Sequence, residues 1–104
     1  MISSTDLIQR YRQGERDFNS VALSQVNLTA ADLKGIDLSY ANLSGVNLAG
    51  ADLRGSSLIG TDLRDTILQQ TNLAEADYSP RLTRFPPDFH PEQAQMHRVI
   101  AVAL

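Results

Sequence analysis

The chain has 104 residues, the size of one domain, and 42% of them are hydrophobic, as is usual for a soluble protein. No apolar run is long enough to span a bilayer, and MISSTDLIQRYRQGERDF has no signal-peptide core, so we expect a cytoplasmic protein without membrane association. The absence of cysteine excludes disulfide and thiol chemistry, and a net charge of −3 argues against binding nucleic acid, which needs a positive surface.

The N-terminal segment, residues 1–16, has the pattern of a capping helix. Three residues whose side chains can cap a helix, Ser4-Thr5-Asp6, precede apolar residues at helical spacing, and the pattern stops before Gly14. The sequence therefore predicts a short α-helix over residues 5–13 that covers one end of the structure built by the following residues.

Residues 17–78 repeat every five residues, with a leucine at every fifth position. A small or β-branched residue stands two places before each leucine, and an Asp or Asn usually stands one place before it. On an α-helix successive leucines would lie about 140° apart, and on a flat strand they would alternate between faces. They can share one interior only if every repeat bends in the same sense, which winds the chain into a solenoid. The leucines are Leu23, Leu28, Leu33, Leu38, Leu43, Leu48, Leu53, Leu58, Leu63, Leu68 and Leu73, with Phe18 and Tyr78 in the same phase.

The triplets Ala31-Asp32-Leu33, Ala41-Asn42-Leu43 and Ala51-Asp52-Leu53 match A-(D/N)-L-x-x, the signature of pentapeptide-repeat proteins. The chain resembles that family over residues 17–78, and its flanks are similar to those of short bacterial, notably cyanobacterial, members. The resemblance implies an all-β solenoid, a right-handed quadrilateral β-helix with four repeats per coil and about three coils. It also implies that the leucine and the residue two places before it point inward.

Residues twenty apart then lie above one another, which makes several side-chain stacks predictable. Phe18 and Tyr78 stand at the two ends of one stack, where their larger rings can fill the space beyond the last leucines. Thr61, Thr66 and Thr71 occupy the inward small position in succession, which suggests a more polar third coil with hydroxyl groups bonded to the backbone.

Outward carboxylates form a second predictable column. Asp32 and Asp52 should lie one coil apart, and two close carboxylates could share a proton or bind a cation. Lys34 and Arg54 follow them on the same side of the coil, so we favour a solvent-exposed set of ion pairs.

Residues 79–104 are predicted to form a proline-containing linker and a second helix. Pro91 suits the first turn of a helix, and the apolar residues after it recur at i, i+3, i+4, i+7 and i+8, which predicts a C-terminal α-helix over residues 91–103. Its apolar stripe is either a lid on the last coil or the contact of a homodimer formed through this helix. The stripe consists of Met96, Val99, Ile100, Ala103 and Leu104.

Catalytic and metal chemistry are not indicated. His90 and His97 are the only histidines, and a separation of seven residues is not a usual zinc spacing. The chain has no nucleophile beside a base and no Gly-rich phosphate loop, and a continuously packed core leaves no cleft. We therefore expect no enzyme, no metal and no cofactor.

Binding through the outer sides is the remaining function class. Tyr40 and Ile59 protrude from one side on consecutive coils, and Ile67 replaces the usual Asp or Asn on another, so these three are contact candidates together with Met96, Val99 and Ile100. We favour a rigid protein-interaction or scaffold module with a protein partner and no nucleic acid. The alternative is a DNA mimic that binds DNA gyrase or another DNA-binding protein, because residues 18–78 hold seven acidic and three basic side chains. Three coils, however, make a rod of only about 15 Å.

Overall fold

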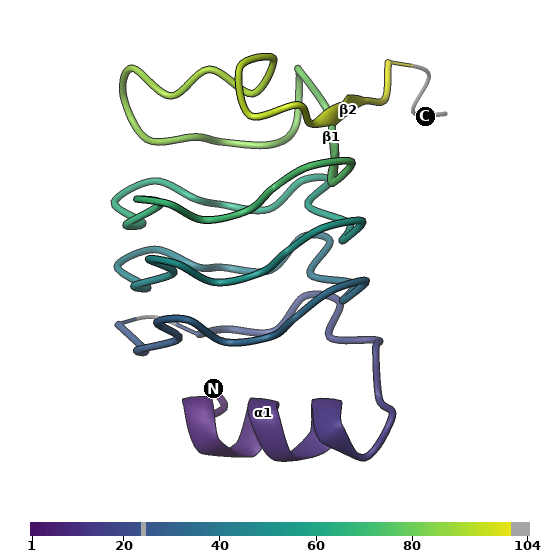
Figure 1. Ribbon diagram of the computed structural model, residues 1–104, viewed down its shortest axis with the longest axis vertical. Coiled ribbons are helices and arrows are strands. Elements are labelled where there is room, and N and C mark those ends of the chain that lie inside the picture. Colours follow the sequence, from purple (N-terminus) through teal and green to yellow (C-terminus); the bar gives the residue numbers. More distant parts are fainter. Residues whose placement is uncertain (24, 101–104) are drawn as a thin grey trace.

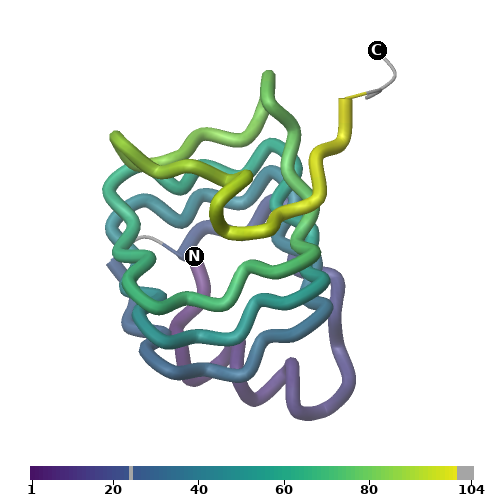
Figure 2. Tube along the Cα trace, turned by 45° about the horizontal axis from the view of Figure 1, so that its top comes forward, coloured from purple at the N-terminus to yellow at the C-terminus, as the bar shows by residue number. Residues whose placement is uncertain are grey.

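The computed structural model describes residues 1–23 and 25–100, which form a stack of coils above one helix (Figure 1). Helix α1 spans Ser4–Arg12, and two short strands, β1 (Asp77–Tyr78) and β2 (His97–Arg98), lie at the opposite end. Viewed obliquely, the coils surround a common axis (Figure 2). Within the described ranges, no helix is both long and apolar enough to cross a membrane.

Parallel pairing of residues twenty positions apart holds the coils together. Isolated bridges join Asp17 to Asp37, Asp37 to Ser57 and Ser57 to Asp77, and the other repeats bridge in the same way. Because each partner lies four repeats further along, one coil contains four repeats and has four sides. Regular strands stay very short, since the chain turns after each bridge.

A β-turn follows each leucine of residues 28–73 and produces the bend that the period requires. In one such turn the Ala51 N–H donates to the Leu48 carbonyl at 2.9 Å, and the third residue of the turn, Gly50, has a φ of +71°. A positive φ at that place is typical of a type II turn. The Oδ1 of Asn47 accepts a hydrogen bond from the Ala49 N–H at 3.0 Å, so an Asp or Asn before the leucine stabilises the turn.

The leucine interior is confirmed. Burying each such side chain contributes roughly 1.5 to 3 kcal/mol. Phe18 is 1% exposed and Tyr78 is 5% exposed, so both ends of their stack are closed by aromatic rings. Leu68 is only partly buried, and the leucines that are at most 2% exposed are Leu23, Leu28, Leu33, Leu38, Leu43, Leu48, Leu53, Leu58, Leu63 and Leu73.

The three inward threonines donate to the backbone of the preceding coil, as the sequence predicts. The hydroxyl groups of Thr61, Thr66 and Thr71 donate to the carbonyls of the leucines 23 positions earlier, at 2.8, 2.9 and 2.7 Å. Ser56 also points inward and is 1% exposed, but its hydroxyl has no partner among the described residues. The interior of the third coil therefore contains hydroxyl groups, of which the three threonine hydroxyls form hydrogen bonds and the Ser56 hydroxyl does not.

Helix α1 closes the first coil. It begins one residue before the predicted helix, and the Ser3 hydroxyl caps it by accepting a hydrogen bond from the Asp6 N–H at 3.0 Å. Leu7 and Tyr11 are buried beneath the coil, and the Tyr11 hydroxyl donates to the Lys34 carbonyl at 2.5 Å.

The predicted C-terminal helix is wrong over residues 91–100, while residues 101–103 lie outside the described ranges. Turns occupy residues 91–95, and β2 then pairs in parallel with β1. Pairing satisfies backbone groups on the exposed edge of the preceding coil, which a helix would leave unpaired. Met96 is 9% exposed because it lies level with Ala76 at an inward position, not because it belongs to a helical stripe.

The segment between β1 and β2 follows the path of a coil without its regular repeat. Arg84 bridges to Asp62, and the Thr83 hydroxyl donates to the Leu58 carbonyl at 2.8 Å. The rings of Tyr78 and Phe85 meet edge to face, with centroids 5.7 Å apart, and Phe85 stacks on Phe89 at 5.0 Å. Aromatic packing therefore closes this end.

Two substitutions separate the satisfied from the unsatisfied inward hydroxyl. Thr61→Val keeps the side-chain shape and removes the hydrogen bond to Leu38, so we expect it to lower the free energy of unfolding by about 0.5 to 1.5 kcal/mol. Ser56→Ala removes a buried hydroxyl without a partner and should raise the free energy by about 1 kcal/mol. Urea denaturation of both variants measures the difference, and an equal loss in the two would contradict the assignment.

Candidate functional site

The outward positions of the repeats form four sides, and one of them carries the largest exposed ring. We call the following set the Tyr40 patch: Asp17, Asp37, Tyr40, Ile59 and Gly60. Asp17 and Asp37 are joined by a bridge, and Tyr40 and Gly60 occupy the same place in consecutive coils, so the set lies on one side of the solenoid.

The Tyr40 side chain is held in place by the coil that follows it. The backbone N–H of Tyr40 donates to the Ile59 carbonyl at 2.9 Å, and Tyr40 is 52% exposed. A Cβ built on Gly60 would lie 2.4 Å from both Cδ1 and Cε1 of the ring, so the ring rests directly on the Gly60 backbone. Ile59 is half-buried beside it. The patch therefore presents a positioned aromatic ring with an aliphatic neighbour.

Two members of the Tyr40 patch, Asp17 and Asp37, are carboxylates on the same side as the ring. Asp37 accepts a hydrogen bond from the Ser39 N–H at 2.9 Å, and Asp17 accepts one from the Asn19 N–H at 3.1 Å. Neither carboxylate forms a salt bridge with a cation in the described part of the chain. The ring thus has an acidic border, which suits a partner with basic groups around an apolar recess.

The six contact candidates predicted from the sequence do not form one surface. Ile67 is 46% exposed on another side, where it continues a column begun by Asn27 and Asn47. Ile100 is 71% exposed at the C-terminal end. Val99 is half-buried and Met96 is buried, so the last two candidates are poorly placed to meet a partner.

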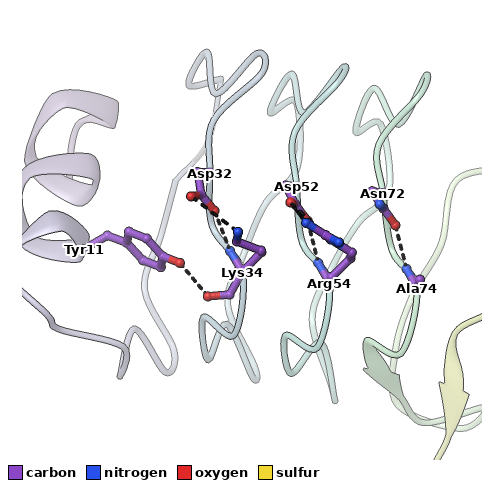
Figure 3. A network of polar contacts seen from close by, with 7 residues as sticks. All are labelled: Tyr11, Asp32, Lys34, Asp52, Arg54, Asn72 and Ala74. Atoms are coloured by element: carbon purple, nitrogen blue, oxygen red, sulfur yellow. Dashed lines mark hydrogen bonds and ion pairs between the residues drawn. The ribbon is translucent and has the colours of Figure 1, made fainter.

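The predicted column of carboxylates is a set of ion pairs within repeats (Figure 3). Asp52 binds Arg54 at 2.7 Å, and Asp32 lies 3.9 Å from Lys34. The hydrogen bonds from Arg54 hold the pKa of Asp52 below its ordinary value. Asn72 continues the column and accepts from the Ala74 N–H at 3.2 Å.

The two histidines lie apart from any metal-like cluster. Nδ1 of His97 is 2.7 Å from Oδ1 of Asp77, an exposed contact that joins β2 to β1. Among the residues that the structure describes, no group of three or more His, Cys, Asp or Glu side chains is arranged to hold a metal ion.

A groove that the sequence did not reveal lies between α1 and the first coil. Its volume is about 500 Å³, and it corrects the expectation that the packed core leaves no cleft. Ile8, Tyr11 and Arg12 of the helix form one wall, and residues 27–32 form the other. No local signal marks it, because the docking of a helix against a coil creates it.

Comparison with known proteins places this geometry in a family of repeat proteins. The family model described as pentapeptide repeats (8 copies) matches residues 17–55 and 56–77. The solved structure of alr5209, a pentapeptide repeat protein from Nostoc Pcc 7120, is 37% identical, has a TM-score of 0.66, and covers 93% of this chain and 96% of its own. No curated protein matches the chain.

Two longer cyanobacterial proteins are also similar. Rfr23 from Cyanothece 51142 is 32% identical, with a TM-score of 0.52, over 62% of this chain and 46% of its own. HetL from Nostoc sp. strain PCC 7120, described as involved in heterocyst differentiation regulation, is 27% identical with a TM-score of 0.50, over 76% of this chain and 45% of its own. The chain thus spans about half the length of these two.

Gly60→Ala tests whether the glycine positions the tyrosine ring. The new methyl group would overlap the ring of Tyr40 and would also strain a residue with a φ of +72°. Gly55→Ala is the matched control, because Gly55 has a φ of +67° with no atom within 4 Å of the added Cβ. We expect Gly55→Ala to destabilise by about 1 kcal/mol and Gly60→Ala by about 1 kcal/mol more. Combining each with Tyr40→Ala in thermal denaturation should remove the excess, and its persistence would refute the contact.

Asp52→Asn tests the ion pair while keeping the oxygen that stabilises the turn. Because folding lowers the pKa of Asp52, its contribution is complete above the unfolded pKa of about 3.9 and is lost as the pH falls through the folded pKa. Since the pair is largely exposed, we expect the variant to lose less than about 1 kcal/mol at pH 7. The difference from wild type should vanish near pH 2 in urea denaturation. A constant difference across that range would contradict a role for the charge.

Proposed function

The chain belongs to the pentapeptide-repeat family, whose members form right-handed quadrilateral β-helices, and we propose that it is a rigid, non-enzymatic protein-interaction module. We propose about three regular coils as the rigid core, with α1 and residues 79–98 as its caps. The interior is filled by leucine, so a partner meets only the outer sides and the ends. The Tyr40 patch is the contact surface that we propose.

The positioned ring of Tyr40 is the observation that carries this proposal. Tyrosine is enriched among the residues that dominate binding energy, because a large ring is immobilised at low entropic cost. Here the Gly60 backbone already supports the ring while about half of its surface remains accessible. A partner would therefore find the ring in place before binding.

The acidic border indicates the chemistry of the partner. Asp17 and Asp37 lie on the same side as the ring and form no salt bridge with the described residues. A protein with an apolar recess bordered by Lys or Arg complements this arrangement. That HetL is described as involved in regulation supports a regulatory rather than a purely structural partner.

Mimicry of DNA is the second candidate and is less well supported. Its motivation is the excess of acidic residues over residues 18–78. Asp52 and Asp62, however, each bind the arginine of their own repeat, at 2.7 and 2.8 Å. A duplex mimic needs a continuous negative surface, which these ion pairs interrupt. We expect no inhibition or protection of DNA gyrase at micromolar protein in a supercoiling assay.

Quantitative affinity capture from native cell extract tests the interaction proposal. We expect Tyr40→Ser combined with Ile59→Ser to weaken capture of the principal partner at least tenfold, because about 2 kcal/mol is typical for the loss of a central contact. Ile67→Ser is the matched control, since Ile67 is 46% exposed on another side and should leave capture unchanged. Equal capture by both variants, with unchanged circular dichroism, would place the contact elsewhere.

A further inference from the structure

The edge of the first coil that faces α1 has unpaired backbone groups, and the equivalent groups of the second coil are all paired. In the second coil the Asn47 N–H donates to the Val26 carbonyl at 3.0 Å, and the Asn47 carbonyl accepts from the Leu28 N–H at 2.8 Å. The Ala49 carbonyl likewise accepts from the Ala30 N–H at 2.9 Å. Three backbone groups on this side therefore pair with the coil below.

The same three groups in the first coil lie twenty residues earlier and are open. The N–H and C=O of Asn27 and the C=O of Thr29 form no hydrogen bond with any described residue, and both residues are exposed. The N–H and C=O of Asp32, on the adjoining side, are open in the same way. An edge of this kind is a template for an added strand.

Ile2, which precedes α1, and Tyr11 of α1 bind the coil on the two flanks of this edge but leave the edge itself open. The Ile2 N–H donates to the Ala22 carbonyl at 3.2 Å, and the Tyr11 hydroxyl donates to the Lys34 carbonyl at 2.5 Å. Between these two contacts lies the groove of about 500 Å³. Its walls include Ile8, Ala30 and Ala31, so apolar side chains of an extended segment would be accommodated.

We propose that the edge at residues 27–32 accepts residues 99–104 of a second copy as an additional parallel strand. That segment reads VIAVAL, with no charged residue and no proline, and its β-branched residues favour an extended conformation. It follows β2 directly, and the Val99 N–H pairs with the Tyr78 carbonyl at 2.8 Å. Ile100 is 71% exposed, so this apolar side chain lies in solvent directly after the paired Val99.

The groove of the same molecule is out of reach, which makes the occupant a second copy. Helix α1 and β2 lie at opposite ends of the stack (Figure 1). The four residues after Ile100 span at most about 14 Å, which is about the height of three coils. Residues 99–104 therefore cannot lie along the edge of their own molecule. One five-residue stretch matches one side of a coil and would bond to the three open groups of Asn27 and Thr29.

This contact is heterologous, since the tail of one molecule meets the groove of the next. Such a contact leads to rings or open chains rather than to a symmetric pair. The expected behaviour is self-association that increases with concentration. It does not depend on the Tyr40 patch, so the Tyr40→Ser and Ile59→Ser variant should self-associate like the wild type.

Amide hydrogen exchange by NMR on the full chain tests the proposal. We expect exchange of the Asn27 N–H to slow at least tenfold between low micromolar and millimolar protein, with a matching rise in mass by sedimentation. Ile100→Asp should abolish both effects, and Ile67→Asp, the same change at another exposed isoleucine, should abolish neither. Adding a synthetic peptide of residues 98–104 to the Ile100→Asp protein should restore the protection of Asn27.

Two results would overturn the proposal. One is a monomer at millimolar concentration whose Asn27 exchange does not respond to the peptide. The other is association that protects the Leu68 and Leu73 N–H groups on the opposite edge while Asn27 stays unprotected. Each variant should first show the wild-type amide spectrum away from the substituted residue, which separates loss of contact from loss of fold.

Discussion

Backbone pairing between residues twenty apart is the interaction on which the whole structure depends. Each repeat exchanges hydrogen bonds with the coils above and below, as Asn47 does with Val26 and Leu28. The pairing keeps one leucine per repeat directed at the axis, and the turn that follows allows the next repeat to do the same. No coil can pair all of its backbone N–H and C=O groups internally, so each coil depends on its neighbours for a stable fold. At the two ends, where a coil has a neighbour on one side only, the chain must cover the core and pair the backbone groups in another way.

The two ends are closed by different physical means. At the first coil, α1 contributes packing from Leu7 and a single hydroxyl from Tyr11, which leaves part of the edge without partners. At the last coil, the backbone itself continues, and β2 pairs with β1 while Phe85 packs on Tyr78. Pairing is partial here as well, since the N–H groups of Leu68 and Leu73 form no hydrogen bond with a described residue. A helix supplies few donors and acceptors from its side chains, whereas an irregular coil supplies its main chain. The difference in cap chemistry produces the groove beside α1.

The repeated part of the fold could be predicted because its rule is local and periodic. One leucine in five fixes the interior, and the inward threonines bond to the backbone as their position predicts. The C-terminal helix could not be excluded in the same way, since Met96, Val99 and Ile100 fall at helical spacing by coincidence. Met96 is buried because of its register with Ala76, a contact set by pairing and not by neighbours in the sequence. The groove was missed for a similar reason, because α1 and residues 27–32 meet only after docking.

The Tyr40 patch, which is the proposed contact surface, consists of residues at outward positions of the repeats. In each repeat the backbone pairs with neighbouring coils and two side chains point into the interior. The side chains at the other positions point outward and can vary without changing the fold. Tyr40 has a φ of +60°, a conformation that glycine adopts in the equivalent place of the next coil. Such a conformation is unfavourable for a bulky residue, and the ring gains little burial in return. The turn imposes this conformation whatever the side chain, because the same positive φ occurs at the equivalent place in other repeats: Ser20, Gln25, Ala30, Asp65, Gln70 and Glu75. The exposed half of the ring is the surface that the proposed partner would cover.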